Sequence, residues 1–218
     1  MKFSEKLFAE FLGTGFLLAV IVGSGIMGER LAGGNAALVL FVNSTATGAG
    51  LVALILAFAP VSGAHFNPLV SLLMARRGEL PWKSVPVYAL AQCLGAVAGV
   101  LATHAMFGLP LLETAAKARP DFNLMWSEFV ATVGLLLVVH RVSRSRPEAV
   151  AYAVGCYIAA AYWFTSSTSF ANPAVTLARS LTDTFTGIRP ADVAGFVAAQ
   201  LMATLLIVMC IHAPVKKQ

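Results

Sequence analysis

The sequence predicts an all-α membrane protein with six transmembrane helices and two re-entrant half-helices, arranged as an inverted three-span repeat. Three observations lead to this fold class. Apolar residues make up 58% of the 218 residues, charged residues make up 11%, and the mean hydropathy is +0.80, which is unlike a water-soluble domain. Six apolar stretches have the length of a membrane span, and two shorter apolar stretches contain Asn-Pro. We therefore expect one transmembrane domain over 1–218, with repeat one at 1–107, a linker at 108–121 and repeat two at 122–218.

The first span is expected at 6–27. Its charged start and apolar continuation resemble a signal peptide. The apolar run is too long for a signal core, however, and it contains Glu10 with no small-residue cleavage pattern after it. We therefore interpret this segment as a transmembrane helix.

Five further spans follow, each close to the roughly 20 residues that a bilayer core requires. They are expected at 36–59, 84–107, 123–141, 149–166 and 191–212. Basic residues cluster at both termini and after every second span, as the positive-inside rule requires: Lys2/Lys6, Arg76/Arg77/Lys83, Arg141/Arg144/Arg146 and Lys216/Lys217. This distribution predicts a plasma (inner) membrane protein with cytoplasmic termini, and it argues that the net charge of +5 does not serve nucleic-acid binding.

Two segments are too apolar for aqueous loops and too short to cross the bilayer. They lie at 62–75 and 169–180, and each contains Asn-Pro. The two halves of the chain also match elsewhere, since Glu10 opens span one as Glu128 opens span four. An odd number of spans per copy places the second copy in the opposite orientation, so the repeat is inverted.

Each Asn-Pro predicts a helix start, because Asn is a strong N-cap and Pro loses no hydrogen bond at the first helical position. A half-helix of about ten residues is ~15 Å long, so two of them meet near the midplane of a ~30 Å core. Their electropositive N-termini then oppose cations and protons but not neutral solutes. The predicted midplane residues are Asn67, Pro68, Leu69, Asn172, Pro173 and Ala174, and the two Asn amides are expected to act as donors to a solute.

The segment Ser62-Gly63-Ala64-His65-Phe66-Asn67-Pro68, with Asn172-Pro173-Ala174 and the duplicated Glu-Phe starts, resembles the aquaporin (major intrinsic protein) family. This resemblance implies a passive channel without a cofactor or an energy source, and a homotetramer in the lipid membrane with one pore per protomer. It also implies a selectivity filter outside the midplane, formed here by Thr47, Ala160, Ser169 and Val175.

The chain departs from the family pattern at this filter. The usual aromatic residue, histidine and arginine are absent from the counted positions, and Val175 stands where the arginine is expected. A wide, arginine-free filter is therefore expected, for glycerol, urea-like solutes, water and undissociated metalloid acids such as arsenite, with methylated arsenicals left open. With Val175 and the Ser-Leu-Thr-Asp-Thr-Phe after Arg179, the chain is similar to the bacterial AqpS-type aquaporins associated with arsenic resistance.

Other residues keep two interpretations. Arg179 shares a helical face with Val175, so it has two alternatives. It either reaches back to the outer mouth as a substitute arginine, or it pairs with carbonyls at the C-terminus of the half-helix and snorkels outward. Glu10 and Glu128 either support the half-helices or relay protons. His65 and Phe66 are expected in the inner vestibule, and Leu69 is expected to alter packing rather than to block the lumen.

Two function classes other than a channel are weighed. An ion- or proton-coupled secondary transporter also uses inverted repeats and broken helices, but titratable residues beside the half-helix tips are lacking apart from His65. An enzyme is not expected, because no nucleophile pairs with a base. Cys93, Cys156 and Cys210 lie in apolar segments without paired spacing, so neither a disulfide framework nor a metal site is predicted.

Overall fold

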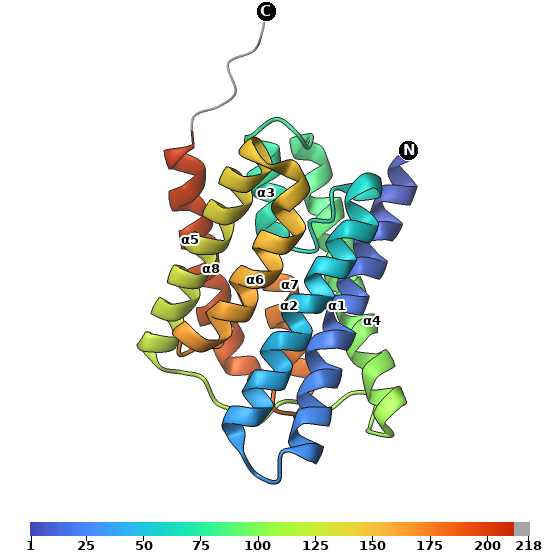
Figure 1. Ribbon diagram of the computed structural model, residues 1–218, viewed down its shortest axis with the longest axis vertical. Helices are drawn as coiled ribbons and strands as arrows, with labels where there is room; N and C mark the ends of the chain where they lie inside the picture. Colours follow the sequence, from blue (N-terminus) through green and yellow to red (C-terminus); the bar gives the residue numbers. More distant parts are fainter. Residues whose placement is uncertain (212–218) are drawn as a thin grey trace, which may run out of the picture.

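The computed structural model describes residues 1–211, and these residues form helices joined by short connections (Figure 1). The long helices are α1 (Phe3–Leu31), α2 (Ala36–Ser62), α4 (Val85–Phe107), α5 (Phe122–Ser145), α6 (Val150–Phe164) and α8 (Pro190–Cys210). The short ones are α3 (Pro68–Arg76), α7 (Pro173–Ala178) and the 3-10 turns η1 (Trp82–Ser84), η2 (Pro147–Ala149) and η3 (Arg179–Leu181). The expected spans and half-helices are therefore confirmed as elements.

Five of the long helices, namely α1, α2, α4 (with η1), α5 and α8, are long and apolar enough to cross a membrane. The sixth, α6, has 15 residues, or about 22 Å at 1.5 Å per residue. The turn η2 precedes it without a break and lengthens the segment. At its other end the chain continues in a non-helical approach to α7.

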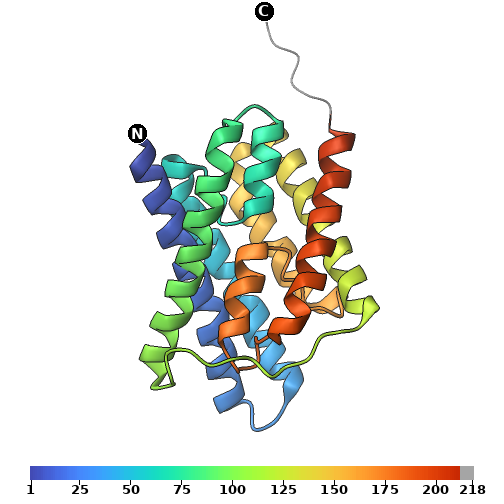
Figure 2. The ribbon, with the colours of Figure 1, turned by 180° about the vertical axis from the view of Figure 1, so that it is seen from behind.

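Both half-helices begin where the Asn caps predict. The Oδ1 of Asn67 accepts a hydrogen bond from the backbone N–H of Leu69 at 2.9 Å. The Oδ1 of Asn172 accepts from Ala174 and Val175 at 3.0 and 3.4 Å. α3 lies toward one end of the bundle and α7 toward the other, with their first turns directed inward (Figure 2).

The remaining helices surround these two. α1 packs against α2 and α4, α2 packs against α6, and α5 packs against α6 and α8. Two glycines allow α4 to approach α1 closely. A Cβ atom at Gly95 would lie 2.1 Å from the carbonyl oxygen of Phe11, and one at Gly99 would lie 2.2 Å from that of Gly15. These helices therefore touch backbone to backbone, as small residues four positions apart permit.

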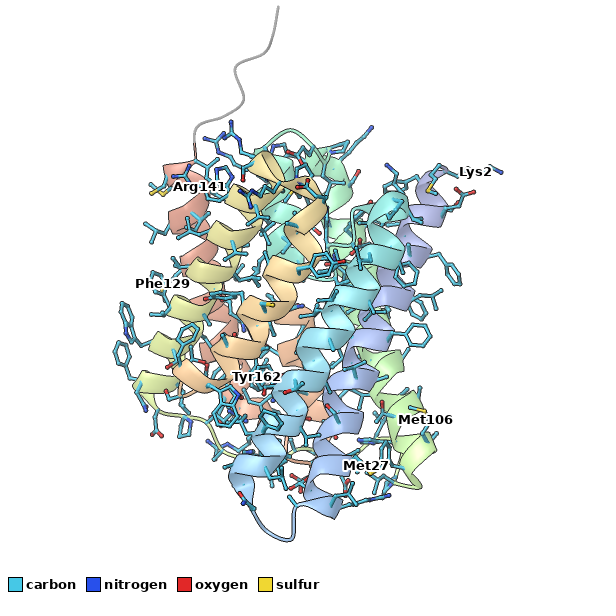
Figure 3. The ribbon with its side chains drawn as sticks, viewed as in Figure 1. Lys2, Met27, Met106, Phe129, Arg141 and Tyr162 are labelled. Atoms are coloured by element: carbon cyan, nitrogen blue, oxygen red, sulfur yellow. The ribbon has the colours of Figure 1, made fainter. Side chains whose placement is uncertain are left out.

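The two ends of the bundle differ in charge. Lys2 and Arg141 lie at one end in Figure 3, which we call the basic end, and Met27 and Met106 lie near the other. The linker at 108–121 crosses that other end (Figure 2), which we call the linker end. α1 begins and α8 ends at the basic end (Figure 1). His212, Lys216 and Lys217 lie outside the described residues.

Candidate functional site

The tips of the two half-helices are tied to each other. The side-chain amide of Asn67 donates to the carbonyl of Ala171 at 2.8 Å, and the amide of Asn172 donates to the carbonyl of Phe66, also at 2.8 Å. Each Asn therefore caps its own helix and bonds the residue just before the opposite one. This reciprocal pair places both helix N-termini at one point inside the bundle.

The backbone leading into the half-helices repeats the same pattern in both halves. Phe66 and Ala171, one residue before each Asn, have φ angles of 50° and 46°. Ala64 and Ser169, three residues before each Asn, have φ angles of 49° and 48°. Left-handed backbone is costly for residues other than glycine and is kept where surrounding contacts impose it.

Two buried carboxylates supply those contacts. Glu10 accepts from the backbone N–H groups of His65 and Phe66 at 2.9 and 2.7 Å, and Glu128 accepts from those of Phe170 and Ala171, both at 2.8 Å. Both side chains are fully buried. Each carboxylate thus replaces the carbonyls that a helix would have offered to these N–H groups.

Side chains from α4 and α8 complete each network. The amide of Gln92 donates to Glu10 at 2.8 Å and to the hydroxyl of Ser71 at 3.1 Å. The amide of Gln200 donates to Glu128 at 2.7 Å and to the hydroxyl of Thr176 at 2.9 Å. Each carboxylate and glutamine thus link the approach to a half-helix with the first turns of that half-helix, and the same geometry recurs in both halves.

A cavity of about 90 Å³ runs beside the half-helix tips. Its lining comes from both halves of the chain and from both sides of the tips. It includes both Asn residues and the non-helical approaches, together with residues of α1, α2, α5 and α6: Leu17, Ile21, Thr47, Leu51, Ile55, Leu135, Val139, Val150, Val154, Ile158 and Tyr162. The wall is mostly apolar, with a few polar groups.

Several residues predicted for the site line this cavity. They are His65, Phe66, Asn67, Thr47, Ser169, Asn172, Val175 and Arg179. Pro68, Leu69, Pro173 and Ala174 do not line it, and Leu69 is fully buried. Leu69 therefore occupies packed space, and its side chain does not obstruct the lumen.

The expectation for Ala160 was wrong. Ala160 is exposed on α6 and does not line the cavity. The lining residues of α6 are instead Val150, Val154, Ile158 and Tyr162, which recur every fourth residue along one helical face. The phenol of Tyr162 lies 3.3 Å from the hydroxyl of Thr47, so a large residue of α6 fills the space that the small Thr47 leaves.

The expectation of an uncharged, arginine-free filter is not confirmed, because Arg179 lines the same cavity as Val175. Arg179 is 2% exposed, which rules out the outward, snorkelling orientation. Its Nε donates to the carbonyl of Thr186, and its guanidinium carbon lies 3.4 Å from the ring centroid of Phe170. α7 ends at Ala178, and the side chain of the next residue leans back along the helix.

The linker holds the backbone around Arg179. The N–H of Ala115 donates to the carbonyl of Ser180 at 3.1 Å, and the N–H of Arg189 donates to the carbonyl of Lys117 at 2.8 Å. Arg119 reaches further inward, because its guanidinium donates to the carbonyls of Gly187 and Ser167 at 3.1 and 3.0 Å. The linker therefore braces the backbone around Arg179 at the linker end of the bundle, although none of its residues lines the cavity.

The fold and the site define a membrane channel protein built on two facing half-helices. A family model described as major intrinsic protein matches residues 1–148. The chain is 50% identical over 202 residues to Aquaglyceroporin AqpS of Rhizobium meliloti (strain 1021), covering 93% of this chain and 86% of that protein. It is 33% identical over 185 residues to Aquaporin NIP1-3 of Oryza sativa subsp. japonica, covering 81% of this chain and 63% of that protein.

The fold has a counterpart among solved structures. The X-ray structure of the aquaglyceroporin from Plasmodium falciparum matches with a TM-score of 0.75 over 95% of each chain, at 21% sequence identity. That identity supports the shared fold alone. The family model and the 50% identical relative show that the chain belongs to the major intrinsic protein family, whose members are channels rather than enzymes.

Proposed function

We propose that the protein is a passive channel for small neutral solutes that carry several hydrogen-bonding groups, with glycerol as its representative substrate. The observation that carries this proposal is the junction of two half-helix N-termini at a cavity lined from both halves of the chain. Water, urea-like solutes and arsenous acid belong to the same class. Like glycerol, undissociated arsenous acid is neutral and presents three hydroxyl groups to the lumen.

The charge at the junction favours neutral solutes. Two helix N-termini contribute partial positive charge at one place, and a cation there meets an unfavourable field. Each Asn amide uses one of its two N–H donors for the cross-bond, so a second donor is available to a passing hydroxyl. The solute replaces its hydrogen bonds to water with hydrogen bonds to these donors and to backbone carbonyls.

The filter in this proposal consists of Thr47, Tyr162, Ser169, Val175 and Arg179. Ser169 has a buried hydroxyl without a hydrogen-bond partner in residues 1–211, and it lines the cavity. The apolar faces of Val175 and Tyr162 suit the carbon backbone of a polyol, whereas Arg179 and Ser169 suit its hydroxyls. The guanidinium also adds to the barrier against cations.

The membrane arrangement is part of the same proposal. We infer that the basic end faces the cytoplasm, because Arg and Lys concentrate on cytoplasmic connections, and that the linker end faces outward. We further expect a homotetramer, with lipid against the remaining exposed apolar surface.

Stopped-flow light scattering on proteoliposomes tests the channel function. We expect glycerol and arsenous acid to enter faster than into empty vesicles, at a rate independent of an imposed proton gradient. Uphill accumulation driven by the gradient would support the secondary transporter instead. Entry no faster than into empty vesicles would refute the channel.

A matched pair of variants on α7 locates the path. Val175 is 3% exposed and lines the cavity, whereas Leu177, two residues further on, is 47% exposed and points away from it. Val175→Trp is expected to abolish glycerol entry because the indole fills the lumen, and Leu177→Trp is expected to leave it unchanged. Equal rates in the two variants would contradict the assignment of the lumen.

A further inference from the structure

Two arginine side chains at the linker end are buried without a carboxylate partner. Arg119 is 6% exposed and Arg179 is 2% exposed. Within residues 1–211 the salt bridges are Arg77 with Glu79 and Arg189 with Asp192, so neither buried guanidinium has a carboxylate within 4.0 Å. The Asp192 carboxylate accepts from the backbone N–H of Arg119 at 2.7 Å instead. A buried charge without compensation is costly.

Both guanidinium groups adjoin one aromatic ring. The guanidinium carbons of Arg179 and Arg119 lie 3.4 and 5.0 Å from the ring centroid of Phe170. Two positive charges therefore lie close together beside one side chain. Glu128 belongs to the same region, but its oxygens already accept from two backbone N–H groups and from Gln200.

The hydrogen-bonding capacity of Arg179 is also largely unused. A guanidinium has five N–H donors. In the described part of the chain the side chain of Arg179 donates one hydrogen bond, from Nε to the carbonyl of Thr186, and the terminal nitrogens donate none. Arg179 lines the cavity together with Ser169, whose buried hydroxyl has no partner in the same residues. Donors without acceptors thus face the lumen beside uncompensated charge.

We propose that the linker end of the lumen contains a binding site for a small, planar, monovalent oxyanion, held by the guanidinium fork of Arg179 and the hydroxyl of Ser169. Arg119 strengthens the site through its charge without touching the ion. A guanidinium pairs with planar oxyanions through two parallel hydrogen bonds, and the cavity of about 90 Å³ admits only small ones. An ion held there obstructs neutral solutes, so such anions inhibit the channel. This inference rests on the channel function proposed above.

Nitrate is a suitable probe because it is small, planar and permanently charged, and gluconate is the matched control because it is too large for the cavity. Glycerol entry into proteoliposomes is measured with either sodium salt at equal ionic strength on both sides. We expect about 100 mM nitrate to slow glycerol entry at least about twofold relative to gluconate, as for a dissociation constant of about 100 mM or below. Equal rates in the two salts would overturn the proposal.

Three variants separate the site from a general salt effect. Arg179→Gln should abolish the nitrate effect, and Arg119→Gln should weaken it. Arg30→Gln removes the same charge from an exposed side chain whose Nη2 bonds the carbonyl of Phe107, and it should retain the full effect. Equal inhibition of the native protein and Arg179→Gln would contradict the assignment.

A binding measurement keeps this test independent of transport. Nitrate should raise the thermal unfolding midpoint of the purified native protein and of Arg30→Gln relative to gluconate, because a ligand of the folded state stabilises it. An equal midpoint in the two salts would overturn the site even if glycerol passes. Absence of glycerol entry in gluconate, with the midpoint shift present, would refute the proposed function but support the anion site.

Discussion

Asn172→Ala tests the junction of the half-helices most directly. The side chain of Asn172 has two roles in the structure. Its Oδ1 accepts from the N–H groups of Ala174 and Val175, and its Nδ2 donates to the buried carbonyl of Phe66. The substitution removes both contacts and leaves the φ angle of its neighbour Ala171, at 46°, with less support.

The expected cost follows from these contacts. Loss of an N-cap costs about 1 kcal/mol, and a buried carbonyl left without its donor costs about 1–3 kcal/mol. The free energy of unfolding should therefore fall by about 2–4 kcal/mol. For a chain of 150–250 residues this corresponds to a midpoint roughly 5–15 °C lower.

Thermal unfolding of the purified protein measures this shift, with Asn123→Ala as the control. Asn123 is exposed at the start of α5, and its replacement should change stability by less than about 0.5 kcal/mol. Asn67→Ala should resemble Asn172→Ala, because it removes a cap and the reciprocal cross-bond. The double variant should deviate from additivity by about 0.5–3 kcal/mol. If Asn172→Ala unfolds at the native midpoint, the cross-bonded junction is not what holds the tips together.

Three further predictions concern the scaffold and the linker. Glu10→Gln should reduce the yield of folded protein. Four groups donate hydrogen bonds to the Glu10 carboxylate, and an amide would turn its own N–H donors toward some of them. Full yield with loss of a proton-dependent flux would indicate a relay. Gly99→Ala should lower stability by about 1–3 kcal/mol, since its Cβ would lie 2.2 Å from the carbonyl of Gly15, and an unchanged midpoint would contradict the close contact. Burial, followed by the charges of neighbouring arginines, lowers the pKa of Lys117 from 10.5 to about 8. Between these two pKa values the unfolded chain binds more protons than the folded one, so the free energy of unfolding should rise with pH. Thermal unfolding midpoints at about pH 7.5 and 9.5 measure this rise, and Lys117→Met should lose it.

Local signals in the sequence were sufficient for the architecture. Span length and the two Asn-Pro caps are each properties of a short segment, and each marks an element that the structure contains. The equivalence of Glu10 and Glu128 was likewise visible in the sequence, because each residue lies near the start of the first span of its repeat. Their partners follow from the repeat, since the residues one and two positions before each Asn meet the carboxylate.

The residues of the proposed filter could not be located by counting positions from the Asn-Pro motifs. Ala160 and Tyr162 differ by two positions, which is a rotation of about 200° on a helix, so a small counting error selects the opposite face. The four-residue recurrence of Val150, Val154, Ile158 and Tyr162 was the available signal. The orientation of Arg179 depends on the loop carbonyl of Thr186 and the ring of Phe170, and neither contact has a local sequence signature.

The two halves of the chain share the half-helix scaffold but differ in the polar groups that they place beside the cavity. The carboxylates, the cross-bonded Asn residues and the strained approaches recur in both halves and hold the half-helix tips beside the cavity. The polar groups of the filter do not recur, because Ser169 corresponds to Ala64 and Arg179 to Met74 when counted from each Asn. The linker, which has no counterpart in the repeat, adds Arg119 to the same end. Because hydrogen-bonding capacity and charge are concentrated there, solutes should be discriminated at the linker end, while the basic end of the lumen sorts them chiefly by size.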